Sequence, residues 1–501
     1  MKFLIPKIIL KALEQISLAG KDYFIIGGCV RDIFLKRNPN DWDITTNATP
    51  EELLLIFKKS NEFFSGAIYT NQFGTVSVLA KSKEENLKII EITTFRSDGK
   101  YTDKRHPEKI TFSKKLEDDV ARRDFTINAV ALKPKKFDKE LVECEIFDFY
   151  NGVDDIKLKL IRAVGDPSVR FDEDALRILR AIRLAVQLGF FIEENTLKAI
   201  KEKISTVDLV SKERVRDEII KIALNDNASL GIKLMEEVGL LKILIPELCD
   251  CIGVSQNKHH IYTVYEHCFR AFDYACMKNF SLEVRLASLL HDIGKPCVKE
   301  GEGKDCTFYN HEVVSAKLTE KILKRLKFPN YILEKVVLLV KYHQFFYDPE
   351  INSDASLRRL LKKVGKENVL ELAQVREADR IGSGCPKALP FRLRHFLFRI
   401  EKVLKELEGE VPSLKMLKIN GNDLIQFDIK EGRKIGYILN ILLEDVLDDP
   451  ESNIKEELIN KSIELNKLSL KELKEKALKA KEKYISVLSE EEREIKRKYH
   501  V

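Results

Sequence analysis

The chain has 501 residues, enough for several domains, and 44% of them are apolar, an ordinary fraction for a globular protein. The net charge of +6 is compatible with an RNA partner but does not indicate one. No CxxC pair occurs among the nine cysteines, no run approaches the ~18 apolar residues of a membrane span, and the first residues lack the apolar core of a signal peptide. We therefore expect a cytoplasmic protein with reduced thiols and no membrane association.

The first segment with a chemical signature follows an amphipathic helix expected at 7–18. The apolar run at 23–26 is typical of a buried strand. Gly27 and Gly28 come next and open a short helical stretch, and a glycine turn of this kind lets backbone N–H groups approach a phosphate. Arg31 adds a forked donor suited to phosphate oxygens. The alternative interpretation of the glycines is a plain tight turn.

Two aspartates, Asp41 and Asp43, lie two positions apart shortly after this helix. On a strand, both carboxylates would point to one face. Carboxylate oxygens suit Mg²⁺, and a pair of metal ions favours phosphoryl or nucleotidyl transfer. Taken alone, the pair is equally explained by two surface charges.

A third carboxylate, Glu91, lies within a strand expected at 87–95, between Ile90 and Ile92. A carboxylate in an apolar strand needs a partner. Glu91 is therefore either an edge-strand charge facing water or a third acidic residue at the metal site. Before this strand, Thr49 is expected to cap a helix and another strand is expected at 74–80.

Further along, two segments combine charged side chains that can contact a nucleotide. Arg122, Asp124 and Asn128 can hold a triphosphate and ribose hydroxyls, or they mark a salt-bridged helix start. In a helix expected at 171–188, Asp174 and Arg177 are neighbours at i and i+3. They form either a modest intrahelical ion pair or an acceptor and donor fork that reads the edge of a base.

Histidines gather in the second half of the chain. Six of the nine lie between His259 and His343, and His291 is followed directly by Asp292. Neutral imidazoles and carboxylates together bind divalent metal ions. Beyond them, a helix is expected at 388–407. A Lys/Glu-rich stretch from 451 onward indicates solvated amphipathic helices or an RNA-facing surface.

The amino-acid sequences of these segments resemble the motifs of one family. Gly-Gly-Cys-Val-Arg-Asp at 27–32, Asp-Trp-Asp-Ile-Thr-Thr-Asn-Ala-Thr-Pro at 41–50, Arg-Arg-Asp-Phe-Thr-Ile-Asn-Ala at 122–129 and Glu-Asp-Ala-Leu-Arg at 173–177 resemble the motifs of class II tRNA nucleotidyltransferases and bacterial poly(A) polymerases. The resemblance implies that Asp41, Asp43 and Glu91 are catalytic, with Asp41 and Asp43 holding Mg²⁺. It further implies nucleotide binding by Gly27, Gly28, Arg31, Arg122, Asp124, Asn128, Glu173, Asp174, Arg177 and Arg180.

The histidine segment resembles the HD phosphohydrolase superfamily, with its H…HD…D pattern. The resemblance implies that His267, His291, Asp292 and Asp379 bind a divalent metal of unspecified identity. His311 and His343 would serve a second metal or a substrate phosphate. A purely structural HD fold is the alternative.

The resemblance implies an α+β protein: a nucleotidyltransferase-type mixed-sheet head at 1–146, then an all-α neck at 147–225, an HD body at 226–390 and a tail at 391–501 that binds tRNA. Its expected activity is addition of CCA to tRNA 3′ ends from CTP and ATP, with HD phosphatase or phosphodiesterase activity in addition. The polar loop at 98–107 resembles the flexible loop of members that add the terminal A. Poly(A) polymerase, an A-adding enzyme, and an HD phosphohydrolase with an RNA-binding head remain as alternatives. The sequence leaves the oligomeric state open.

Overall fold

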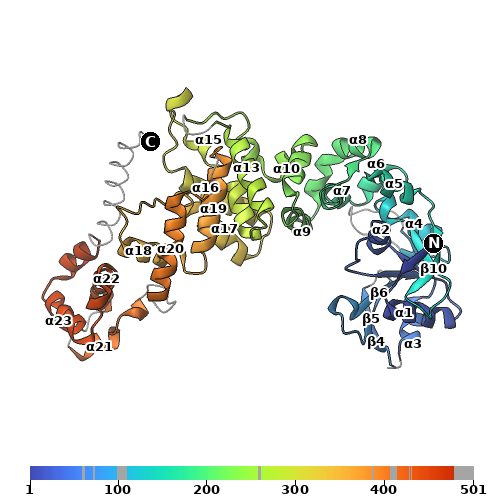
Figure 1. The fold of residues 1–501 in the computed structure, drawn as a ribbon, viewed down its shortest axis with the longest axis horizontal. Helices are drawn as coiled ribbons and strands as arrows, with labels where there is room; N and C mark the ends of the chain where they lie inside the picture. The colour runs from blue at the N-terminus through green and yellow to red at the C-terminus, as the bar shows by residue number, and fades with distance from the viewer. Residues whose placement is uncertain are drawn as a thin grey trace. The chain divides into compact units, whose positions relative to one another are not determined.

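The computed structural model describes residues 1–58, 62–71, 74–98, 110–257, 261–385, 389–406, 414–427, 429 and 432–478 (Figure 1). The chain forms two compact units. The first contains residues 1–252 with 276–282 and 321–330, and the second contains 253–275, 283–320 and 331–501. The finer division into four domains remains a prediction.

The first unit begins with an eight-stranded sheet in the order β1-β10-β9-β2-β3-β6-β5-β4. Only the β3–β6 pair is parallel within it; the other neighbours are antiparallel. The sheet is therefore mixed, and the α+β prediction is confirmed. The strands of the structure are β1 (Lys2–Leu4), β2 (Tyr23–Ile26), β3 (Asp43–Thr46), β4 (Phe64–Asn71), β5 (Thr75–Ala80), β6 (Ile89–Thr94), β7 (Arg96–Asp98), β8 (Ile110–Phe112), β9 (Ala131–Pro134), β10 (Leu141–Phe147), β11 (Leu160–Ile161) and β12 (Phe191–Ile192).

Helices make up most of the remainder. Those up to residue 252 are α1 (Lys7–Leu18), α2 (Gly28–Phe34), α3 (Pro50–Ile56), α4 (Leu116–Ala121), α5 (Gly152–Leu158), α6 (Pro167–Glu173), α7 (Leu176–Leu188), α8 (Glu194–Lys203), α9 (Lys212–Ala223), α10 (Ala228–Glu237), α11 (Leu240–Leu244) and α12 (Pro246–Cys249). The later ones are α13 (Val264–Met277), α14 (Leu282–Leu290), α15 (Lys295–Val298), α16 (His311–Arg325), α17 (Asn330–Tyr342), α18 (Asp354–Val364), α19 (Val369–Gly382), α20 (Phe391–Glu406), α21 (Gly421–Gln426), α22 (Gly432–Asp448) and α23 (Lys455–Asn466).

Strand alternation decides which face of the sheet carries chemistry. Ile44 on β3 and Ile90 and Ile92 on β6 are buried in the core that also contains the apolar residues of α1. Successive side chains of a strand point to opposite faces. Asp43 and Glu91 therefore point to the other face of the sheet, away from this core.

Local signals in the sequence explain several helix ends. Thr49 accepts from the backbone N–H of Glu52, and Glu52 accepts from that of Thr49, which is the predicted capping box of α3. Gly189 ends α7 in the left-handed conformation, as expected of a C-cap. Ser211 occupies the N-cap position of α9, but its side chain makes no capping hydrogen bond.

One predicted helix is interrupted. Instead of a continuous helix at 171–188, α6 ends at Glu173 and α7 begins at Leu176. Asp174 lies between them in an extended conformation, with φ −146° and ψ 102°. Its side chain accepts from the Leu176 backbone N–H at 3.1 Å, a local bond of the kind by which aspartate competes with helical structure.

Candidate functional site

Asp43 and Glu91 are direct neighbours in the sheet. Asp43 is the first residue of β3 and pairs with Glu91 of β6 in the parallel register. Asp41 lies in the bend before β3, so the expectation that both aspartates lie on one strand was wrong. Asp41 is nevertheless close enough to Asp43 for its carboxylate to raise the pKa of Asp43.

The negative charges of Asp41, Asp43 and Glu91 influence one another. Burial raises the pKa of Asp43 above 3.8, Arg123 opposes this, and the carboxylates of Glu91 and Asp41 raise it further. Like charges close together raise a carboxyl pKa, so a divalent cation would relieve the repulsion. The residues therefore fit a cation. Among the described residues, however, the oxygens of these three carboxylates do not all lie within 4.8 Å of one another.

Gly27 lies against Asp43 at the end of β2. Its φ is +95°, and a Cβ atom at this position would lie 2.8 Å from Asp43 Oδ2 and 3.4 Å from Arg123 Nη1. Gly27 is therefore needed both for its backbone conformation and for this close approach. Gly28 follows as the first residue of α2. A Cβ atom at Gly28 would lie 3.5 Å from Arg31 Nη2.

Four predicted nucleotide-binding residues form a chain of polar contacts. Arg31 donates from Nη1 to Asn128 Oδ1 at 2.9 Å, and Asn128 Nδ2 lies 3.4 Å from Asp124 Oδ1. Arg180 donates from Nε to Asp124 Oδ2 at 2.8 Å. Burial alone would raise the pKa of Asp124, but Arg180 lowers it to about 2. The chain holds the Arg31 and Arg180 guanidinium groups in fixed positions.

Asp119 is a residue that the sequence reasoning missed. It is fully buried and accepts from Arg122 Nη2 at 2.6 Å and from Arg123 Nη2 at 3.3 Å. Burial would raise its pKa, but the two arginines lower it. Its spacing of three and four residues before the arginines was a usable signal. Asp119 anchors both guanidinium groups beside β3, where Thr45 also donates to it at 3.2 Å.

In the Glu-Asp-Ala-Leu-Arg segment at 173–177, the ion pairs differ from the predicted intrahelical pair. Asp174 and Arg177 do not form an ion pair with each other; Arg177 instead donates to Glu173 Oε2 at 2.7 Å and to the Arg122 carbonyl at 2.9 Å. Asp174 accepts from Arg214 of α9 at 2.7 and 3.2 Å. The interruption between α6 and α7 turns Asp174 away from the α7 surface, which explains the difference. Glu173 orients Arg177 as expected.

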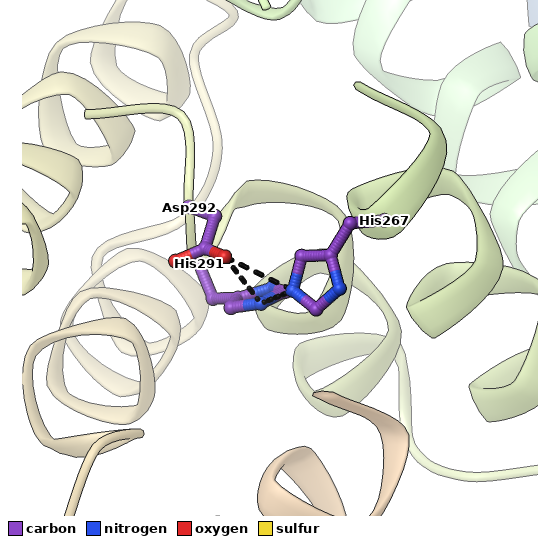
Figure 2. Close-up of side chains that lie close together, drawn as sticks. All are labelled: His267, His291 and Asp292. Carbon is purple, nitrogen blue, oxygen red and sulfur yellow. Dashed lines mark hydrogen bonds and ion pairs between the residues drawn. The ribbon is translucent and has the colours of Figure 1, made fainter. Parts of the chain in front are cut away.

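A second group of side chains lies in the HD segment (Figure 2). His267 of α13 reaches towards His291, with 2.8 Å between their Nε2 atoms, and towards Asp292 Oδ2 at 3.0 Å. Asp379 Oδ1 on α19 lies 3.3 Å from His267 Nε2 and 3.7 Å from His291 Nε2. The structure thus brings all four predicted ligands together. Ligand atoms of His267, His291 and Asp292 all lie within 4.8 Å of one another.

The other oxygen of Asp292 faces the two remaining histidines. His311 Nε2 lies 3.1 Å and His343 Nε2 lies 3.6 Å from Asp292 Oδ1, and these three residues form a second group within 4.8 Å. The ring Nδ1 atoms of His291, His311 and His343 are each 2.7–2.8 Å from a backbone carbonyl. This arrangement fixes the tautomer that leaves Nε2 available, as in metal-binding histidines.

Electrostatics support a cation in this cluster. Burial would lower the pKa of His291, but Asp292 and Asp379 raise it to about 10, so a positive charge is favoured at this point. Burial lowers the pKa of His343 to about 4, which keeps it neutral and able to bind a metal. Lys295 and Arg376, which the sequence reasoning missed as site residues, contact Asp292 Oδ2 and Asp379 Oδ2, each at 2.7 Å.

Some predictions fall outside the described residues. These are the loop at 98–107 apart from Asp98, which ends β7, the pair His259-His260, and the stretch from 479 to the end of the chain. Among the helices that the structure describes, none is long and apolar enough to cross a membrane.

Three family models match the chain. The Poly A polymerase head domain matches residues 23–162, the probable RNA and SrmB-binding site of polymerase A matches 189–252, and the HD domain matches 264–383. The first range contains the predicted catalytic carboxylates, and the third contains the four predicted metal ligands of the histidine cluster.

Comparisons with known proteins agree with these matches. The CCA-adding enzyme of Lactobacillus helveticus is 41% identical over 227 residues, which are 45% of this chain and 52% of that protein, so the chain spans about half the length of this relative. The CCA-adding enzyme of Staphylococcus haemolyticus is 28% identical over 89% of this chain and 95% of its own length. A crystal structure of the Bacillus stearothermophilus CCA-adding enzyme in complex with CTP is 26% identical, covers 92% of this chain and 97% of its own, and has a TM-score of 0.64. The chain therefore carries a Poly A polymerase head domain, a probable RNA-binding region of polymerase A and an HD domain, in that order, and it is similar to CCA-adding enzymes.

Proposed function

We propose that this protein adds CCA to tRNA 3′ ends from CTP and ATP and releases pyrophosphate. The observation that carries the proposal is the pairing of Asp43 with Glu91, beside the Gly27 turn and the arginines anchored by Asp119. The match to a relative solved with CTP supports the choice of nucleotide. The cytoplasm is the proposed location, because all nine cysteines are free thiols.

Each group of residues has a distinct role in this proposal. Asp41 and Asp43, assisted by Glu91, would hold two Mg²⁺ ions, which when bound lower the pKa of the RNA 3′-hydroxyl and neutralise triphosphate charge. The backbone N–H groups of the Gly27-Gly28 turn and the guanidinium of Arg31 orient the triphosphate. No amino-acid nucleophile is required, since the RNA hydroxyl itself attacks.

The Glu-Asp-Ala-Leu-Arg segment would select the base. Arg177 is held by Glu173 and by the Arg122 carbonyl, so its guanidinium edge is fixed in direction. Asp174 is fixed by Arg214. A planar donor and an acceptor in fixed positions can pair with the edge of cytosine or adenine, which replaces a nucleic-acid template. Arg122, Asp124, Asn128 and Arg180 would complete the nucleotide site.

The test is incubation of the purified protein with a tRNA transcript lacking CCA, Mg²⁺ and labelled CTP or ATP, singly and together. Sequencing of the products is expected to show C, C, A and then a stop. Addition of a single A to tRNA ending in CC, with CTP unused, would instead assign an A-adding enzyme. A long A ladder on any RNA would assign a poly(A) polymerase. Either result would refute base selection of C and A by Asp174 and Arg177.

We propose a second activity for the HD cluster, metal-dependent hydrolysis of phosphoesters. The convergence of His267, His291, Asp292 and Asp379 supports it. A divalent metal held there would polarise a phosphoryl oxygen. Asp43→Asn and Asp379→Asn, each assayed for CCA addition and for hydrolysis of phosphoesters, separate the activities. If Asp43→Asn leaves all activity of the protein intact, the chain is an HD phosphohydrolase with an RNA-binding head.

A further inference from the structure

Helix α20 (Phe391–Glu406) packs against the rest of its unit along one side. Leu393, Phe396, Ile400 and Val403 recur at helical spacing and are buried. Arg399 donates from Nε to Asp354 at 3.0 Å and from Nη1 to the Asn352 carbonyl at 2.6 Å. These contacts fix the rotation of the helix about its axis. The side chains on its other side are therefore held towards solvent.

The exposed side of α20 carries aromatic side chains. Phe391 and Phe398 are two turns apart and are 64% and 66% exposed. The ring of His395 lies between them, with ring centroids 5.6 Å from Phe391 and 6.3 Å from Phe398. Tyr347 fixes this ring, because its hydroxyl lies 2.7 Å from His395 Nδ1. Burial of a phenylalanine side chain is worth roughly 1.5–3 kcal/mol, so two exposed ones on one face indicate a binding surface.

The charge beside the rings is positive. Arg394 is exposed on the same face and forms no ion pair with any of the residues that the structure describes. Arg392, two positions earlier and so on another side of the helix, pairs with Asp348 at 3.0 Å, and its side chain is 44% exposed. Rings and guanidinium groups together suit unstacked nucleotides, since bases stack on the rings and phosphates pair with the cations. A base-paired duplex would offer the rings no free base to stack on.

We propose that Phe391, Arg394, His395 and Phe398 form an RNA-binding face that takes unpaired nucleotides of the substrate. This proposal rests on the proposed function, because it takes the polyanionic tRNA as the occupant. The face would contribute affinity for RNA and no chemistry. Its loss should therefore weaken binding of tRNA without altering the addition step.

The test compares full-length variants. Phe391→Ala/Phe398→Ala removes both rings, and Tyr331→Ala, at an aromatic residue 68% exposed elsewhere, is the matched control. Filter binding with labelled tRNA lacking CCA should show a Kd about tenfold higher for the double variant and unchanged for the control, as base stacking on one or two rings predicts. With saturating tRNA, both should add CTP at the rate of the unaltered protein. Arg394→Gln should reduce the slope of log Kd against log salt by about 0.7, the contribution of one phosphate contact.

Two results would overturn the proposal. The first is equal tRNA affinity of the double variant and the control. The second is a change in oligomeric state of the double variant, measured by light scattering, which would assign the face to a second copy of the chain. Failure of the unaltered protein to add CCA would refute the proposed function but leave this affinity comparison valid, so the two failures are distinguishable.

Discussion

The closeness of Gly27 to Asp43 makes Gly27→Ala the most discriminating substitution in the head. The new Cβ atom would lie 2.8 Å from Asp43 Oδ2, whereas ordinary contacts begin at 3.4 Å. The carboxylate oxygen must therefore move by about half an ångström. The fold can tolerate this movement, because the oxygen is the end of a rotatable side chain. Catalysis is less tolerant, since a misplacement of about 1 Å can cost about a hundredfold in rate.

We expect Gly27→Ala to reduce the single-turnover rate of CTP addition to tRNA by roughly 10- to 100-fold. The backbone conformation of Gly27, with φ +95° and ψ −148°, adds a folding cost on the order of 1–3 kcal/mol for alanine. Thermal unfolding followed by circular dichroism measures that cost separately. Rates are then compared at a temperature at which every variant is folded.

Gly20→Ala provides the control. Gly20 also has a positive φ of +72°, but a Cβ atom there would meet nothing within 4 Å. This variant also places alanine at a positive φ but lacks the collision, so it should keep its rate of addition. If Gly27→Ala were as active as Gly20→Ala, the precise position of Asp43 Oδ2 would not matter, and its assignment as a catalytic oxygen would be refuted.

Three further predictions concern other parts of the molecule. The pKa of Asp124 is lowered to about 2 beside Arg180. The ionised Asp124 therefore stabilises the fold above pH ~4, and this stabilisation is lost as the pH falls towards 2. In urea unfolding, the unaltered protein should lose about 2 kcal/mol more stability over this pH range than Asp124→Asn. Arg214→Gln leaves Asp174 without its partner, and sequencing of the added nucleotides should show misincorporation rising about tenfold, whereas unchanged fidelity would contradict base selection by Asp174. His267→Ala should weaken Mn²⁺ or Ni²⁺ binding, measured by calorimetry, by at least about a hundredfold while CCA addition continues; unchanged metal binding would place the metal elsewhere.

Local signals in the sequence predicted the elements and the residue types of both sites. The glycine turn after β2, the Thr49 capping box and the Gly189 cap depend on neighbouring residues only, and each is present in the structure. The four ligands of the histidine cluster were implied by the resemblance to the HD superfamily, and the structure brings them together. The roles of the site residues were predicted from the resemblance of the motifs to known families. Hydrophobic periodicity and spacing alone were also consistent with a non-functional interpretation of each site.

Tertiary structure decided the partners. Asp174 pairs with Arg214, forty residues away, and not with Arg177, because the chain leaves the helix at Asp174. Asp43 gains Glu91 only through the parallel pairing of β3 with β6, which no local pattern specifies. Ion pairs and strand register depend on which distant segments the core brings together. The sequence by itself determined which side chains were available, and packing determined which of them share a site.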